Sequence, residues 1–190
     1  ATVNGAEARY RQFDVDSTVE VDLSGQQFNS SPVLHIEYSG VLNPEDDRRD
    51  PILAKVSEDS AFLLYGGKWF PTNGLYRDPA NMRLKVLAPA GWSLVTDVAR
   101  SGDTYASAQP SYWGTVLAGK YKASDMKSEK AEVSINTLNA PTDAASAMAE
   151  TAGKMFDFYT SRFGPPPSNQ FRIVEVDGAN WPSQWSVGML

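Results

Sequence analysis

Apolar and polar residues alternate in short segments along the first two thirds of the chain. Between Phe13 and Leu23 nearly every second residue is apolar, and the intervening residues are acidic or threonine. A period of two predicts a half-buried strand across residues 13–23. Further short apolar or alternating segments, separated by Gly, Pro or Asn, predict more strands. They are residues 33–38, 62–65, 82–86, 92–95, 112–117, 119–121 and 133–138.

The spacing becomes helical towards the end of the chain. From Ala145 to Phe163 apolar residues recur every three or four positions. This spacing predicts one amphipathic helix over residues 141–163, which Gly164 and the prolines after it should end. We expect a stripe of this helix to pack on the next predicted strand, residues 171–176. The stripe comprises Ala145, Met148, Ala152, Met155 and Tyr159.

These two patterns predict the fold class and its division into domains. Short strands without helical spacing predict an antiparallel, sandwich-like β domain over residues 1–110. Residues 111–190 are expected to form a small α+β segment with one long helix. The predicted fold is therefore mainly β, and a hydrophobic content of 42% is sufficient for a packed core.

Composition excludes several function classes. The chain has 17 Lys and Arg residues against 23 Asp and Glu residues, a net charge of −6, so nucleic acid is not an expected partner. No apolar run approaches the roughly 20 residues of a membrane span, so none is expected. Cysteine is absent, which excludes disulfides, thiolate zinc sites and cysteine nucleophiles. Its absence fits a reducing compartment or an exported bacterial protein.

Few polar residues form a pattern that indicates chemistry. His35 is the only histidine, so this chain cannot complete a two-histidine zinc site, and a surface position is favoured over a base or metal ligand. Residues 43–50 contain four carboxylates, for which a solvated, self-paired loop is favoured over calcium binding. Glu37 and Glu175 lie on polar strand faces without an identifiable partner, so neither is assigned acid–base chemistry.

Large aromatic residues permit two interpretations. Their faces could bind peptide or glycan, or they could fill the core and anchor loops, which is favoured. A free-standing β-sandwich module that binds peptide or glycan through surface aromatics therefore stays open as the alternative function. The set is Trp69, Phe70, Tyr76, Trp92, Trp113, Trp181 and Trp185, with Leu75 beside Tyr76.

One ordered series of motifs is more specific than composition. The segments are residues 64–71 (LYGGKWFP), 89–92 (PAGW), 118–121 (AGKY), 156–167 (FDFYTSRFGPPP) and 171–176 (FRIVEV). In this order they resemble the N-terminal β domain and the start of the catalytic domain of aminopeptidase N-type (gluzincin) zinc metallopeptidases. The resemblance covers roughly residues 30–190.

This resemblance implies a non-catalytic fragment. The zinc motif of the family, H-E-x-x-H, is absent from the sequence. We therefore expect no catalytic residue and no metal ligand in this chain, and zinc in a larger, exported or periplasmic parent hydrolase. The implied partners are a peptide substrate, in the parent, and the remainder of the catalytic domain.

The resemblance also implies a role for the C-terminal segment as one edge of the substrate cleft. The family commonly has Gly-x-Met-Glu-Asn near this point, with a Glu that holds the substrate amino terminus, but residues 184–190 contain no Glu. In the isolated chain the same apolar strand is expected to favour self-association. The expected cleft-edge residues are Trp181, Gln184, Trp185, Ser186 and Gly188.

Overall fold

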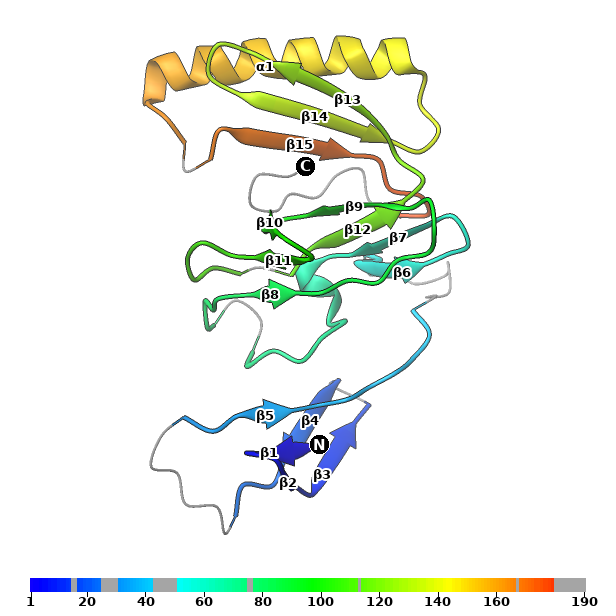
Figure 1. Cartoon of the computed structure of the whole chain (residues 1–190), viewed down its shortest axis with the longest axis vertical. Helices are drawn as coiled ribbons and strands as arrows, with labels where there is room; N and C mark the ends of the chain where they lie inside the picture. The colour runs from blue at the N-terminus through cyan, green and yellow to red at the C-terminus, as the bar shows by residue number, and fades with distance from the viewer. Residues whose placement is uncertain are drawn as a thin grey trace. The chain divides into compact units, whose positions relative to one another are not determined.

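The computed structural model contains two compact units, Ala1–Val41 and Leu42–Leu190. It describes residues 1–14, 17–24, 31–42, 51–74, 77–112, 114–166 and 168–179. Most of the regular structure in these ranges is strand, arranged in several sheets with one α-helix (Figure 1). The mainly β fold class is therefore confirmed. The domain boundary predicted at residue 110 stays a prediction.

The first unit consists of two small antiparallel sheets. One has the order β2-β1-β5, and the other is the hairpin β3-β4. The strands are β1 (Thr2–Val3), β2 (Ala6–Glu7), β3 (Tyr10–Phe13), β4 (Thr18–Val21) and β5 (Leu34–His35).

The single strand predicted over residues 13–23 is wrong. The chain reverses direction after Phe13, which pairs with Thr18 across the hairpin, and Ser17 has a positive φ of 56°. Polar residues that fit the exposed face of a strand also fit a turn. The alternation of apolar and polar residues therefore continues across the turn between β3 and β4, and it did not reveal that turn.

The second unit begins with two antiparallel sheets. A four-stranded sheet has the order β6-β7-β12-β9, and a three-stranded sheet has the order β10-β11-β8. Residues Ser60–Phe62 of β7 and all four residues of β12 are buried, which fits their apolar sequences. The elements are β6 (Ala54–Val56), β7 (Ser60–Leu63), the 3-10 turn η1 (Tyr65–Gly67), β8 (Arg83–Leu84), β9 (Ser93–Thr96), β10 (Ala99–Ser101), β11 (Thr104–Ala106) and β12 (Val116–Gly119).

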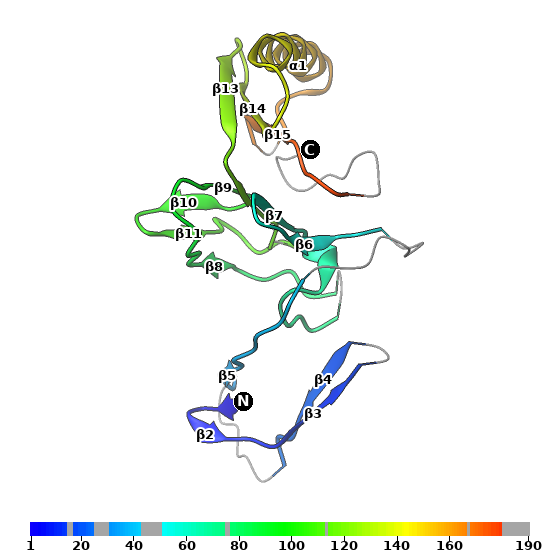
Figure 2. The same ribbon diagram turned by 90° about the vertical axis from the view of Figure 1, so that its right-hand side faces the viewer.

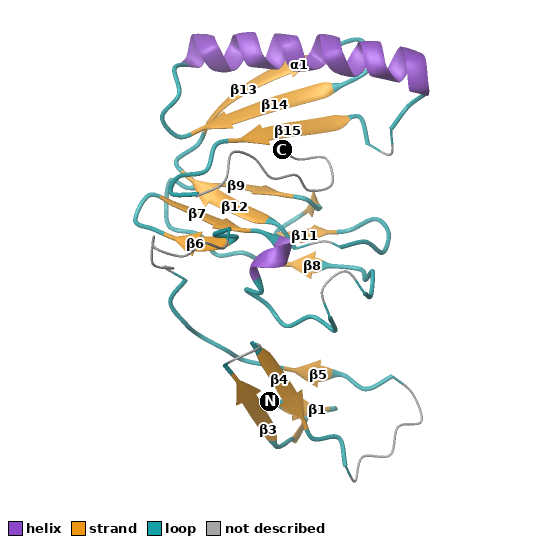
Figure 3. Cartoon of the chain, turned by 180° about the vertical axis from the view of Figure 1, so that it is seen from behind, coloured by secondary structure: helices purple, strands orange, loops and turns teal. Residues whose placement is uncertain are grey.

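An α+β layer follows in the same unit. Strands β13 (Lys122–Lys127) and β14 (Glu132–Thr137) form an antiparallel hairpin, and β15 (Gln170–Val174) lies parallel to β14. Because parallel neighbours need a crossover, the long helix α1 (Thr142–Phe163) connects them and lies along the sheet (Figures 2 and 3). The predicted helix is confirmed.

The predicted contact face of α1 is partly wrong. The buried residues of the helix are Ala145, Ala149 and Gly153, and they face β13 and β14. At Gly153 an added Cβ atom would meet the flexible end of the Met126 side chain, so the helix lies close to the hairpin at this point. The larger Met148, Met155 and Tyr159 are left half exposed beside this contact.

Candidate functional site

The predicted cleft-edge residues lie outside the part of the chain that the structure describes. These are Trp181, Gln184, Trp185, Ser186 and Gly188. Their assignment therefore stays a prediction, and the described chain leads towards them through β15 and residues 175–179.

Strand β15 is an edge strand within the described residues. The sheet order is β13-β14-β15, so the backbone groups on one side of β15 bond to β14 and those on the other side have no strand partner in the described ranges. An edge of this kind can accept an added extended strand, because its N–H and C=O groups point outward in the sheet plane.

Glu175 links the end of β15 to the loop just before α1 by hydrogen bonds. Its Oε2 atom accepts hydrogen bonds from the backbone N–H groups of Leu138 at 2.7 Å, Asn139 at 3.1 Å and Ala140 at 3.3 Å. Its own N–H donates to the carbonyl of Asn136 at 2.8 Å. The sequence could not identify these partners, because they are backbone groups 35 to 37 residues away.

Tyr121 lies close to Glu175 and was not singled out from the sequence. Its ring packs against the core cluster that includes Phe62 and Val174. Its hydroxyl is buried and has no hydrogen-bond partner among the described residues. Burial raises the pKa of the Tyr121 hydroxyl, and the negative charge of Glu175 raises it further.

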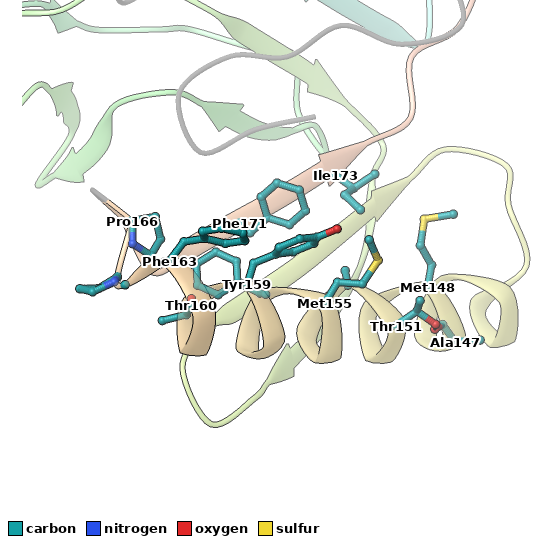
Figure 4. Close-up of a pocket in the computed structure, with 14 residues that line it drawn as sticks. Ala147, Met148, Thr151, Met155, Tyr159, Thr160, Phe163, Pro166, Phe171 and Ile173 are labelled. Atoms are coloured by element: carbon teal, nitrogen blue, oxygen red, sulfur yellow. The ribbon is translucent and has the colours of Figure 1, made fainter.

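An apolar groove opens between α1 and β15 (Figure 4). It has a cavity volume of about 860 Å³, and none of its lining residues is charged. The side chains of Met148, Met155, Tyr159 and Phe163 project from the same side of the helix, facing Phe171 and Ile173 of β15. The small Ala145 and Ala149 of α1 are buried against the hairpin, whereas Met148, Met155 and Tyr159 are half exposed beside the groove.

Three solved structures that resemble this chain are an aminopeptidase N family protein and two M1 zinc metallopeptidases. An aminopeptidase N family protein from Idiomarina loihiensis matches 90% of this chain with a TM-score of 0.56 at 14% identity. An M1 zinc metallopeptidase variant from Deinococcus radiodurans, bound to a Tyr-Ser-Ala substrate, matches 91% with a TM-score of 0.56 at 20% identity. A two-domain M1 zinc metallopeptidase bound to L-tryptophan matches 91% with a TM-score of 0.55 at 18% identity.

The chain has the fold of one part of an aminopeptidase N-type metallopeptidase. It spans only 29% of the length of the Idiomarina chain and 45% of the Deinococcus chain. No family model and no curated protein matches the sequence itself. The resemblance predicted from the order of the motifs is thus confirmed as a likeness of fold.

The described residues contain few groups that could bind a metal ion. Within them, no three His, Cys, Asp or Glu side chains come together as a possible metal group. His35 lies on the surface, as predicted, with a 63% exposed side chain whose Nε2 is 3.3 Å from Oε1 of Glu37. The acidic loop at residues 43–50 is outside the described ranges. No helix in these ranges is long and apolar enough to cross a membrane.

The described aromatic residues near η1 connect loops of the aminopeptidase N-type fold. The Trp69 indole N–H donates to the carbonyl of Gly114 at 3.0 Å, and the Trp69 and Phe70 rings are 4.7 Å apart. Tyr65 contacts both Phe70 and Tyr112, with centroid distances of 6.0 and 6.1 Å. These contacts fit the anchoring interpretation. Leu75, Tyr76, Trp113, Trp181 and Trp185 are not among the described residues.

Proposed function

We propose that this chain forms the N-terminal β region and the first layer of the catalytic domain of a zinc metallopeptidase of the aminopeptidase N type. One observation carries the proposal: the likeness in fold extends over nine tenths of this chain but less than half of each matched chain. A free-standing binding module would instead be expected to match proteins of its own length along their whole extent.

In this proposal the chain does not catalyse peptide hydrolysis by itself. Zinc, where it is bound, would supply Lewis-acid activation of the scissile carbonyl and of water. The chain contains one histidine and no cysteine, so its sequence lacks the usual ligands for such a site. The metal would be held by residues outside this sequence.

The proposed contribution of this chain to the reaction is one edge of the substrate cleft. The segment from Trp181 to Gly188 follows β15, whose outer edge is unpaired within the described residues. A peptide lying alongside as an added strand would bond to backbone groups. Because residues 184–190 carry no carboxylate, this segment can bind a peptide only through its backbone, its neutral polar side chains and its apolar surface.

Metal analysis of the purified, tag-free chain tests this proposal. We expect no stoichiometric zinc after dialysis, and no cleavage of an aminoacyl reporter. The full-length metallopeptidase, prepared in the same way, should retain zinc and cleave the reporter. Zinc that survives dialysis in the chain alone, or cleavage that a chelator abolishes there, would contradict the proposal.

A further inference from the structure

The sequence contains two Asn-Gly pairs, Asn4–Gly5 and Asn73–Gly74, and the structure describes both. A glycine leaves its backbone nitrogen sterically open, so this nitrogen can attack the side-chain carbonyl carbon of the asparagine before it. Because the two pairs have the same composition, a difference in their reactivity must come from their surroundings. The structure holds the two pairs in different ways.

Asn4 is fixed in a tight hairpin turn. It connects β1 with β2 and has a φ of 50°, and Gly5 has a φ of 84°. The N–H of Asn4 donates to the carbonyl of Val33 at 2.8 Å, and its Oδ1 accepts from the N–H of Val33, also at 2.8 Å. The attack by Gly5 needs the Asn4 backbone and side chain to rotate. This rotation would move Oδ1 away from Val33 and distort the hairpin, so the fold protects Asn4.

Asn73 lies outside the helices and strands, between η1 and β8. Both Asn73 and Gly74 are exposed. The side-chain Nδ2 of Asn73 donates a hydrogen bond to Oδ2 of Asp78 at 2.5 Å. Because this pair belongs to no hairpin, its backbone can rotate without opening a sheet.

Two charged side chains lie beside the atoms of Asn73–Gly74 that would react. The Cδ atom of Arg77 is 2.8 Å from the position that a Cβ atom would take on Gly74, so the arginine side chain lies against this glycine. Positive charge near the Gly74 nitrogen favours the loss of its amide proton. The Asp78 carboxylate contacts the nitrogen that would leave, where it stabilises the positive charge that develops as ammonia departs.

We propose that Asn73 is a site of spontaneous deamidation, with Arg77 and Asp78 as positioning residues. The Gly74 nitrogen loses its proton and bonds to Cγ of Asn73, the bond between Cγ and Nδ2 breaks, and ammonia carries the proton away. Water then opens the resulting succinimide to aspartate or isoaspartate. This reaction needs only water and residues of this chain, so it is independent of the proposed function.

Deamidation changes the loop between η1 and β8 irreversibly. A carboxylate at residue 73 cannot donate to Asp78, so repulsion between like charges replaces the hydrogen bond. Isoaspartate also lengthens the backbone, because the chain then continues through the former side-chain carbon. The loop therefore gains negative charge and loses a contact as the protein ages.

Incubation of the 190-residue chain in mildly alkaline buffer, followed by proteolysis and mass spectrometry, measures both asparagines in one sample. We expect Asn73 to convert to aspartate and isoaspartate faster than Asn4 by about tenfold or more. In concentrated urea the two rates should become similar, because the hairpin no longer protects Asn4. Equal rates in the folded chain, or faster conversion at Asn4, would overturn the proposal.

Asp78→Asn tests the positioning role, because it removes the charge while its Oδ1 can still accept from Asn73. It should slow conversion at Asn73 by about threefold or more and leave the rate at Asn4 unchanged. Unchanged or faster conversion at Asn73 would overturn the role of Asp78. Asn73→Gln is the control for the site, since glutamine forms the larger ring far more slowly.

The rate at Asn4 also reports whether each variant folds. A rate at Asn4 that rises to its value in urea identifies a variant that has lost the fold. Arg77→Gln, which removes the other charge, then replaces Asp78→Asn and should likewise slow conversion at Asn73. An unchanged rate at Asn73 in a folded Arg77→Gln variant would overturn the role of Arg77.

Discussion

The carboxylate of Glu175 lies 2.7 Å from the backbone nitrogen of Leu138, which donates a hydrogen bond to its Oε2 atom. The same oxygen accepts the next two N–H groups along the chain, just before α1 begins. One side chain thereby joins the end of β15 to the loop that connects β14 with the helix. This loop determines where α1 starts over the sheet, and β15 leads towards the proposed cleft edge.

Glu175→Ala should lower the free energy of unfolding by about 1–3 kcal/mol, because three backbone donors lose their acceptor. Glu175→Gln should cost less, since its amide keeps one oxygen that can accept. Urea unfolding followed by circular dichroism measures both. The control is Glu150→Ala, which removes an exposed carboxylate paired only with Lys154 and should change little. Equal effects at the two positions would contradict this role of Glu175.

Tyr121 should make the stability of the protein sensitive to alkaline pH. Burial and the charge of Glu175 raise the pKa of its hydroxyl in the folded state, whereas unfolded tyrosine titrates near pH 10. The stabilisation is therefore complete below about pH 10 and is lost as pH rises towards the folded-state pKa.

The Tyr121→Phe variant removes this titration. Near pH 8 it should be as stable as the unchanged protein or slightly more so, since the hydroxyl has no partner among the described residues. At pH 11 the variant should be the more stable of the two, by up to about 1.4 kcal/mol beyond any difference at pH 8. Urea midpoints at both pH values measure the difference. A difference that does not change with pH would show that Tyr121 does not titrate as described.

Two substitutions on α1 distinguish its buried face from its groove face. Ala149 is 2% exposed and packs against the β13–β14 hairpin. Ala149→Asp should therefore lower the free energy of unfolding by about 3 kcal/mol or more, because it buries an unpaired charge. Met155 is half exposed, so Met155→Asp in the 190-residue chain should cost less than about 1 kcal/mol. Thermal unfolding compares them. A severe loss of stability in the Met155→Asp variant would support the predicted packing stripe, which includes Met155.

The proposed cleft edge predicts a kinetic effect in the proposed parent metallopeptidase. Trp185→Ala should raise KM for a peptide substrate by about tenfold with a smaller change in kcat, because an aromatic contact to the substrate is lost away from the metal. Lys127→Ala, an exposed change on β13, serves as the control. Unchanged KM at Trp185→Ala would argue against its place in the cleft.

The sequence predicted the extent of α1 well but not the face on which it packs. Its start and end are within one residue of the prediction, since regular apolar spacing followed by Gly164 is a local signal. Which face is buried depends on the contacts of α1 with β13 and β14, which the spacing within the helix does not report. The apolar spacing alone favoured Met148 and Met155 as residues of the buried face.

Other features could not be predicted from the sequence, because they too depend on contacts between distant residues. Strand β13 has the sequence KASDMK, in which Met126 is the single large apolar residue, so its alternation was too weak to predict a strand. The hairpin of the first unit and the role of Glu175 depend on a turn and on distant backbone groups. The order of short motifs, by contrast, led to the fold through its resemblance to a known family, whose likeness in fold the solved structures bear out.

We propose that this chain is a catalytically silent part of an aminopeptidase N-type zinc metallopeptidase. The decisive measurement is the initial rate of aminoacyl-reporter hydrolysis by the 190-residue chain and by the full-length protein, side by side, with and without a zinc chelator. We expect no hydrolysis by the chain and chelator-sensitive hydrolysis by the full-length protein. Chelator-sensitive hydrolysis by the chain alone, or none by a zinc-loaded full-length protein, would contradict it.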